Sequence, residues 1–305
     1  MERVAFVFPG QGAQYPGMGK PLYDRYPEVR ALYEKAEKIR PGITELCFSG
    51  SAEDLKQTQN TQPCLFLTEL AAATVLANSG LQPAALAGFS LGEITALTFG
   101  GAFDPVQGFD IVCRRGEQMA AAGAGMQTSM AAVLKLDADA VETVCAAHEQ
   151  LYPVNYNCPG QITVSGRSDS LDAAKKDFLA AGGRVVPLAV SGAFHSPFMA
   201  DAAETFGKYL ASCQIQPPQI PVYSNRTAQP YGQEVRELMQ SQIHHPVLWE
   251  KSIRAMAEDG ICAFIEVGPG QTLSKLIQKT LPEVKTYHAE TPEDIAAIVS
   301  EVPVC

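Results

Sequence analysis

The stretch GFSLGE, residues 88–93, places Ser90 between two glycines in this 305-residue chain. An apolar run precedes it at 84–87, and LGEITALTF after it is typical of the start of a helix. Glycines beside a serine permit a strand-to-helix turn that is too tight for larger side chains and that exposes the hydroxyl. Ser90 is therefore either a nucleophile or an ordinary turn serine. The first interpretation requires a base, an anion hole and a substrate anchor.

His195 is the candidate base among the five histidines. It lies in SGAFHSPFM, a segment rich in small residues. This segment leaves a predicted inserted subdomain, residues 127–190, and is expected to cross back over the cleft between the two domains. Imidazole is suited to proton transfer near neutral pH, and a structural histidine is the alternative. The other histidines have positions typical of structural or solvated side chains, or lack metal-ligand spacing; they are His148, His244, His245 and His288.

We expect backbone groups, and not charged side chains, to form the oxyanion hole and to orient His195. No Asp or Glu follows Ser90 in a hydrolase-triad pattern, so we expect a Ser–His dyad oriented by a neutral group such as a backbone carbonyl. Backbone N–H groups of Leu91 and of the loop around Gln11 are candidate oxyanion donors. That loop, PGQGAQYPG, has neither a dinucleotide fingerprint nor a P-loop, so we expect no phosphate site there.

Arg115 is the most informative charged residue. In a helix over 105–123, position 115 shares one face with positions 108, 112 and 119, which include Val112 and Met119. That face is expected to point into the protein, whereas Arg114 points to solvent. A buried guanidinium needs a partner, and a substrate carboxylate matches its two-pronged donor geometry. An internal salt bridge, for example to Glu93, is the alternative.

Strands and helices that alternate along the chain must position these residues. Apolar runs at 4–8, 84–89 and 263–268 predict short buried strands, and long helices are predicted over 61–80 and 105–123. This order predicts an α/β fold with a mostly parallel sheet. The helix boundaries are marked by Pro63 near the first turn and Gly80 after the end of one helix, and by Asp104 as N-cap, Pro105 and Gly123 in the other.

Residues 127–190 have a different pattern, which predicts a small inserted subdomain. The expected order is β-α-β-β-α-β, the split arrangement of ferredoxin-like units. We expect the functional site in the cleft between this unit and the larger domain formed by 1–126 and 191–305. The segments are SMAAVL, DADAVETVCAAHEQ, YPVNYN, ITVSG, SDSLDAAKKDFLAAG and RVVPLAV.

Composition narrows the possible function classes. Hydrophobic residues make up 46% and charged residues 18%, which is typical of a globular protein with a sizeable core. The net charge of −10 argues against general nucleic-acid binding. Eight cysteines without a CxxC pair favour reduced thiols and argue against a zinc site. The charged N-terminus and the absence of a long apolar run predict a cytoplasmic protein without a signal peptide or membrane span.

Motifs along nearly the whole chain resemble malonyl-CoA:acyl carrier protein transacylase, the acyltransferase family of fatty acid and polyketide synthesis. The resemblance implies an α/β-hydrolase-like core with a ferredoxin-like subdomain. It is carried by FPGQGAQYPGMG, TQPCLF, GFSLGE, RRGEQM, NYNCPGQITVSG, SGAFHSPFM, PVLW and EVGPGQTL, in the order of the family.

The resemblance also implies a role for individual residues. It makes Ser90 the nucleophile, His195 the base, and the backbone carbonyl of Gln242 the group that orients the imidazole. The other implied residues are the oxyanion donors Gln11 and Leu91, the carboxylate-binding Arg115, and the cleft residues Met119, Phe194, Asn155 and Asn157. Phe194 in AFH resembles the malonyl-selecting form. Phe89 departs from the family, which most often has His there, so malonyl preference rests on Arg115 and Phe194.

The implied function is malonyl transfer from CoA to the phosphopantetheine thiol of acyl carrier protein through a seryl ester. No metal and no cofactor other than the substrate CoA is expected. A monomer that binds neither nucleic acid nor membrane is expected. The alternatives are an acyl-thioester hydrolase with a proofreading role on the same scaffold, and a non-catalytic carrier-protein docking module. Candidate contacts for the acidic carrier protein are Lys251, Arg254, Lys275 and Lys279.

Overall fold

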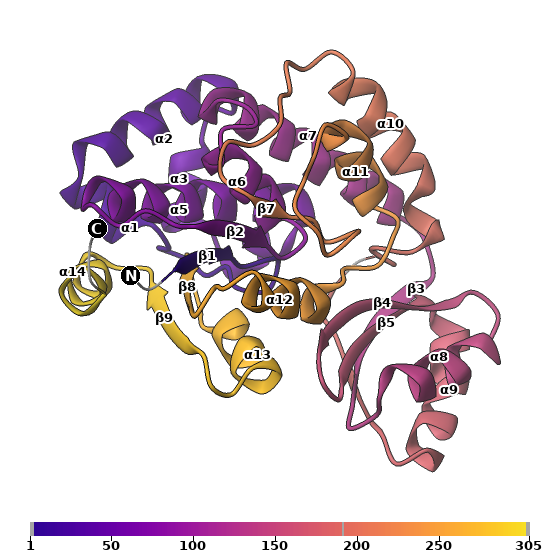
Figure 1. The fold of residues 1–305 in the computed structure, drawn as a ribbon. Coiled ribbons are helices and arrows are strands. Elements are labelled where there is room, and N and C mark those ends of the chain that lie inside the picture. Colours follow the sequence, from indigo (N-terminus) through magenta and orange to yellow (C-terminus); the bar gives the residue numbers. More distant parts are fainter. Residues whose placement is uncertain (1–2, 191, 303–305) are drawn as a thin grey trace.

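A five-stranded parallel sheet forms the centre of the larger part of the molecule (Figure 1). The computed structural model describes residues 3–190 and 192–302. The strand order is β7-β2-β1-β8-β9, and every neighbouring pair is parallel. The prediction of an α/β fold with a parallel sheet is therefore confirmed. The strands are β1 (Val4–Phe8), β2 (Ala85–Gly88), β7 (Val222–Tyr223), β8 (Ala263–Val267) and β9 (Lys285–Ala289).

Helices cover both faces of this sheet (Figure 1). In β1, Phe6 and Phe8 belong to the large hydrophobic cluster under one layer of helices, whereas Ala5 and Val7 belong to a smaller cluster on the opposite face. Because alternate residues face opposite sides of a strand, an entirely apolar run fits a strand that is buried on both sides.

Two groups of helices form these layers. Those on the face of the large cluster are α1 (Lys20–Arg25), α2 (Pro27–Ile39), α3 (Ile43–Ser49), α4 (Ala52–Lys56), α5 (Thr58–Asn78), α6 (Gly92–Phe99), α7 (Pro105–Gly123), α10 (Ala200–Leu210), α11 (Val235–Gln242) and α14 (Pro292–Glu301). Those on the other face are α12 (Trp249–Glu258) and α13 (Thr272–Thr280). A short 3₁₀ helix, η1 (Pro197–Met199), precedes α10.

A second, antiparallel sheet has the order β4-β5-β3-β6. Its elements follow the predicted β-α-β-β-α-β order, and Figure 1 shows this part beside the larger one. The small subdomain is thus present. The proposed boundaries at 126/127 and 190/191 remain predictions, and residues 1, 2, 191 and 303–305 lie outside the described residues. The elements are β3 (Thr128–Leu134), α8 (Ala138–Ala146), β4 (Leu151–Cys158), β5 (Gln161–Arg167), α9 (Ser168–Ala180) and β6 (Arg184–Pro187).

Backbone hydrogen bonds join the small sheet to the larger part. Val247 N–H donates to the carbonyl of Val154 at 2.9 Å, and Tyr156 N–H donates to the carbonyl of Val247 at 2.9 Å. Residue 247 therefore extends the edge of β4 by one isolated bridge, opposite Asn155. This bridge fixes the position of Asn155 relative to the larger part.

The long helix α5 begins earlier than the sequence predicts. It starts at Thr58, so that Pro63 lies inside the helix and not near its first turn. Proline cannot donate to the carbonyl four residues before it. Here the guanidinium of Arg40 donates to that carbonyl, on Gln59, at 2.6 Å, and so replaces the missing hydrogen bond.

The boundaries of α7 agree with the prediction. The carboxylate of Asp104 accepts hydrogen bonds from the backbone N–H groups of Val106 and Gln107, and Gly123 is the last helical residue. Within residues 3–190 and 192–302, no helix is long and apolar enough to cross a membrane.

Candidate active site

Ser90 lies on a strand-to-helix bend between β2 and α6. Its φ of 54° is in the left-handed region, which non-glycine residues seldom adopt. A Cβ atom on Gly88 would lie 1.9 Å from the carbonyl carbon of Gly92, and one on Gly92 would lie 2.2 Å from the carbonyl oxygen of Phe8. Only glycine fits at either position. The GxSxG pattern therefore reflects the steric needs of this bend.

Asn225, which follows β7, holds the bend in place. Its side-chain oxygen accepts a hydrogen bond from Ser90 N–H at 2.7 Å, and its amide nitrogen donates to the carbonyl of Gly88 at 2.6 Å. Asn225 is completely buried, and its own N–H donates to Glu93 at 2.7 Å. A single amide thus fixes the backbone on both sides of Phe89.

His195 is positioned to take a proton from Ser90. Its Nε2 lies 2.7 Å from the Ser90 hydroxyl oxygen, and its Nδ1 lies 2.9 Å from the backbone carbonyl oxygen of Gln242. A carbonyl only accepts hydrogen bonds, so Nδ1 carries the hydrogen and Nε2 is free to accept the serine proton. The orienting group is thus the neutral carbonyl that the sequence predicted.

The surroundings of His195 keep it neutral. Burial lowers the pKa of the imidazole, the positive charge of Arg115 lowers it further, and the hydrogen bond to Gln242 only partly opposes them, which leaves a pKa of about 4. At neutral pH the imidazole is therefore an unprotonated base.

Arg115 reaches the same serine from the buried face of α7. Its guanidinium donates to the Ser90 hydroxyl oxygen at 3.1 Å, to the side-chain oxygen of Gln242 at 2.7 Å and to that of Gln62 at 2.8 Å. The residue is 1% exposed, and its Nε has no hydrogen-bond partner among the described residues. Burial lowers the pKa of Arg115 to about 10, so it stays charged at neutral pH.

The alternative of a direct salt bridge between Arg115 and Glu93 is not what the structure shows. Among residues 3–190 and 192–302, no ion pair includes Arg115. The side-chain amide of Gln242 connects the two groups: it donates to Glu93 at 2.5 Å and accepts from Arg115 at 2.7 Å. Burial raises the pKa of Glu93 to about 7, although hydrogen bonds and the charge of Arg115 oppose the rise. Arg115 thus has neutral direct partners.

A cavity of about 90 Å³ is lined by every predicted site residue except Gln242 and Asn157. The backbone N–H groups of Gln11 and Leu91 donate no hydrogen bond within the described part of the chain, which leaves them available to an oxyanion. The cavity is lined by Gln11, Gln62, Phe89, Ser90, Leu91, Arg115, Met119, Met130, Asn155, Leu188, Val190, Phe194 and His195.

A neighbouring cavity of about 220 Å³ shares Gln11, Phe89, Asn155 and Leu188 with the first. Asn155 and Asn157, from β4, both line it, and within the described residues their side-chain oxygens have no hydrogen-bond partner. Two buried amide oxygens without a partner in the described part of the chain thus lie in the wall of this cavity. Larger hollows of about 530 and 590 Å³ lie over the start of α7 and contain none of the predicted site residues.

Comparison with known proteins identifies the family. Residues 5–299 match the model of the acyl transferase domain. The chain is 38% identical over 303 residues to malonyl CoA-acyl carrier protein transacylase of Bacillus subtilis, covering 97% of this chain and 96% of the relative. The chain belongs to the acyl transferase family. The prediction of this family from the sequence motifs, and with it the prediction of an enzyme, is confirmed.

Solved structures of acyl transferases have the same fold. A malonyl CoA-acyl carrier protein transacylase from Clostridium perfringens has a TM-score of 0.95 and 33% identity, covering 98% of this chain and 96% of that chain. A malonyl-transacylase in complex with a type II PKS acyl-carrier protein has a TM-score of 0.95 and 29% identity, covering 98% and 100% of the two chains.

The site also contains acyl transferase residues that sequence reasoning missed. Asn225 fixes the bend, Gln62 holds Arg115, and the side chain of Gln242 connects Arg115 with Glu93. Gln62 carried a local signal, because it lies in the TQPCLF motif, and Gln242 was predicted for its backbone carbonyl but not for its side chain. Asn225 lies in SNRT, outside every motif that we used, and 135 residues separate it from Ser90.

Proposed function

We propose that this acyl transferase moves a malonyl group from CoA to the phosphopantetheine thiol of acyl carrier protein through an ester on Ser90. The observation that supports the proposal is the buried cation beside the nucleophile: Arg115 contacts the Ser90 hydroxyl and has no direct carboxylate partner among the described residues. Malonyl is a diacid with one end activated as a thioester. Its free carboxylate suits a guanidinium in a water-poor site.

The first half-reaction forms the seryl ester. His195 Nε2 takes the hydroxyl proton as the Ser90 oxygen attacks the thioester carbonyl. The N–H groups of Gln11 and Leu91 stabilise the negative oxygen of the tetrahedral intermediate. The C–S bond then breaks, and the proton from His195 leaves with the sulfur as CoA thiol. Arg115 pairs with the malonyl carboxylate throughout.

The second half-reaction reverses this chemistry. His195 removes the proton of the carrier-protein thiol, the sulfur attacks the seryl ester, and the proton returns to the Ser90 oxygen. No metal or redox group is required. In a Ser-His-Asp triad, the carboxylate stabilises the imidazolium that forms when histidine takes the serine proton. His195 is oriented by a neutral carbonyl and lacks this stabilisation. This difference favours attack by a thiol over hydrolysis, which needs activation of water.

The cavity of about 220 Å³ is the proposed channel for the pantetheine arm of both substrates. This arm contains amide groups, and the side-chain amides of Asn155 and Asn157, whose oxygens have no partner among the described residues, can hydrogen-bond with them once they turn toward the channel. The carrier protein is proposed to dock where this channel opens. Lys275 and Lys279 are exposed on α13, whose first residues line the channel.

Intact mass spectrometry tests the proposal. Wild-type protein incubated with malonyl-CoA should gain the mass of one malonyl group, and carrier protein added afterwards should remove that group and become malonylated. Ser90→Ala should gain nothing. Transfer of the acyl group from malonyl-CoA but not from octanoyl-CoA would support a site that selects acyl groups with a free carboxylate.

The same experiment separates the alternatives. Release of free octanoate without malonyl transfer would reject the proposal and favour the acyl-thioester hydrolase. Binding of carrier protein by a chain that is never acylated would favour a non-catalytic docking module.

A further inference from the structure

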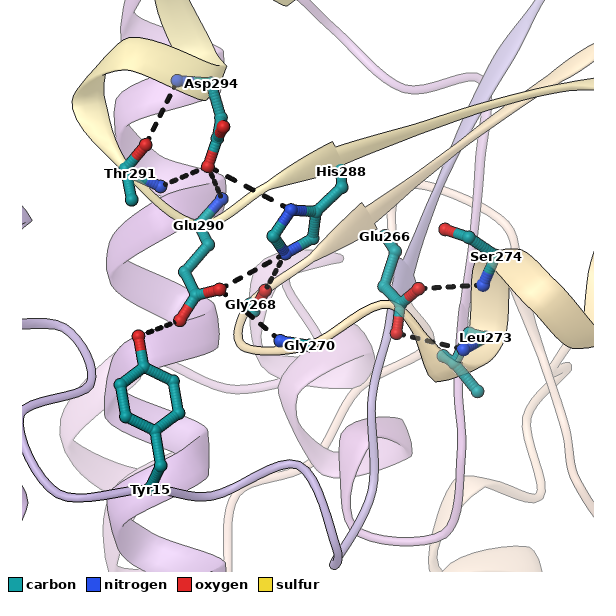
Figure 2. Close-up of polar contacts among 10 residues, drawn as sticks. All are labelled: Tyr15, Glu266, Gly268, Gly270, Leu273, Ser274, His288, Glu290, Thr291 and Asp294. Atoms are coloured by element: carbon teal, nitrogen blue, oxygen red, sulfur yellow. Dashed lines mark hydrogen bonds and ion pairs between the residues drawn. The ribbon is translucent and has the colours of Figure 1, made fainter.

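A cluster of charged residues at the end of β9 and the start of α14 lies outside the site described above. Figure 2 shows the Glu290 carboxylate between Tyr15, from the N-terminal loop, and the turn that contains Gly268 and Gly270. In the same figure His288 lies beside Gly268, and its Nε2 is 3.1 Å from the Gly268 carbonyl oxygen. The cluster therefore joins three segments that are far apart in the sequence.

The carboxylate of Glu290 makes contacts with all three segments. One oxygen accepts a hydrogen bond from the Tyr15 hydroxyl. The other accepts one from the backbone N–H of Gly270 at 3.4 Å and lies 3.4 Å from Nε2 of His288. The Glu290 side chain is 13% exposed and that of His288 is 17% exposed, so water screens these contacts only partly.

The carboxylate of Glu290 is charged. Burial alone would lower the pKa of His288, but the hydrogen bond and the charge of Glu290, together with Asp294, raise it above its usual value. Burial raises the pKa of Glu290, and the hydrogen bonds from His288 and Tyr15 lower it by more. The carboxylate is thus a charged acceptor for Tyr15, and charged acceptors make stronger hydrogen bonds than neutral ones.

The backbone of Glu290 is itself fixed. The carboxylate of Asp294 accepts hydrogen bonds from the N–H groups of Glu290 at 3.3 Å and Thr291 at 2.9 Å, and Thr291 accepts from Asp294 N–H at 3.1 Å. This capping box begins α14. Glu290 therefore reaches Tyr15 from a rigid base.

The turn at 268–270 packs against the loop that carries Gln11. Gly268 has a φ of +126°, and a Cβ there would lie 3.3 Å from Pro9. A Cβ on Gly270 would lie 3.8 Å from the Cβ of Ala13. The turn thus lies close to the loop on both sides of Gln11, and Glu290 holds Tyr15 just beyond it.

We infer that Glu290 is a positioning residue for the oxyanion hole: by joining Tyr15 to Gly270, it holds the loop at 9–15 so that the N–H of Gln11 faces the reacting carbonyl. The inference rests on the proposed function, because it assigns the cluster to the formation of the seryl ester. The cluster touches neither Ser90 nor the cavity around it, so its effect is indirect.

Single-turnover malonylation of Ser90, followed by intact mass, tests this inference. Tyr15→Phe and Glu290→Ala should each slow the reaction about tenfold, because a displaced donor stabilises the oxyanion less well. The KM for malonyl-CoA should stay unchanged, and each chain should still accept one malonyl group. The double variant should be no slower than the slower single variant, because both changes remove the same contact. Glu290→Gln, which keeps one acceptor oxygen, should recover part of the rate.

Tyr209→Phe is the matched control. Tyr209 donates to a carboxylate oxygen of Asp110 at 2.6 Å, a tyrosine–carboxylate pair of the same kind away from the loop, and its loss should leave the rate unchanged. Unchanged rates in Tyr15→Phe and Glu290→Ala would overturn the inference, as would a raised KM with unchanged kcat. A lower final amount of malonyl ester with the normal rate constant would indicate loss of folding and would also overturn it. Failure of the wild-type protein to be malonylated would instead contradict the proposed function.

Discussion

At the scale of single residues, Arg115 is the buried cation on which the proposed preference for malonyl depends. Burying a guanidinium costs several kcal/mol unless its donors are satisfied. Three neutral oxygens, on Ser90, Gln62 and Gln242, accept from it, but none cancels the charge. In the proposed function, this charge binds the free carboxylate of the malonyl group.

Replacing Arg115 should change acyl preference. We predict that Arg115→Ala lowers kcat/KM for malonyl-CoA by about 100-fold or more, in line with the loss of a buried charge pair, and leaves kcat/KM for acetyl-CoA within about threefold. Steady-state assays with both thioesters measure this. Arg114→Ala is the control, since Arg114 is exposed and pairs with Asp110 and Glu117. An equal loss for both thioesters would assign Arg115 to the support of Ser90 alone.

The acid limb of the pH profile should report His195. With a pKa of about 4, the imidazole is neutral above that pH and becomes protonated as the pH falls through it. A protonated imidazole cannot accept the serine proton, so the malonylation rate should fall about tenfold per pH unit below about 4. A histidine with an ordinary pKa would cause this fall already near pH about 6.5.

Rapid-mixing malonylation from a neutral stock into buffers of falling pH measures this limb, with circular dichroism to show that the chain stays folded. A change near pH 7 would report Glu93, whose pKa is about 7, and is a separate event. If the rate is half-maximal near pH about 6.5 and this midpoint shifts in Glu93→Gln, the fall in rate reports Glu93. If the midpoint stays near pH about 6.5 in Glu93→Gln, the prediction of a lowered pKa for His195 is wrong.

At the scale of secondary-structure elements, local signals were sufficient for most of the fold. The N-cap at Asp104 and the stop at Gly123 placed α7 correctly, and its 3.6-residue period placed Arg115 on the buried face. The glycine spacing around Ser90 predicted the bend. Each of these signals lies within a few residues of the structure that it determines.

The errors and omissions concern contacts between distant segments. The predicted start of α5 was wrong because Arg40 supplies the hydrogen bond that Pro63 cannot donate. Arg40 lies at the C-terminal end of α2, so the residues around Pro63 do not indicate this contact. Asn225 was missed for the same reason: its role depends on the pairing of β7 with β2, which brings residue 225 beside the bend. A single sequence contains no direct sign of such pairing.

At the scale of the whole molecule, the proposed docking of an acidic carrier protein sets a requirement on the distribution of charge. The chain has a net charge of −10, so general attraction to an acidic carrier protein is excluded and a local basic surface is needed. Lys275 and Lys279 meet this need on α13, whereas Arg254 on α12 is already paired with Glu250 at 2.8 Å. The proposed docking surface therefore rests on α13.

Charge reversal tests this surface. We predict that Lys275→Glu with Lys279→Glu raises the KM for carrier protein about tenfold at low salt, less at high salt, and leaves malonylation by malonyl-CoA unchanged. Steady-state transfer at two ionic strengths measures this. The control is Lys35→Glu with Lys38→Glu, a matched reversal on α2, over the opposite face of the sheet (Figure 1). Equal effects of the two reversals would show that only total charge matters.

The hydrogen bonds between Val247 and the edge of β4 have a consequence for engineering. An exchange of residues 127–190 between relatives would separate β4 from the segment at 247 to which it is hydrogen-bonded, and a mismatch there would shift Asn155 within the proposed channel. Chimaeric enzymes made to alter acyl choice should therefore exchange the region around residue 247 together with the insert.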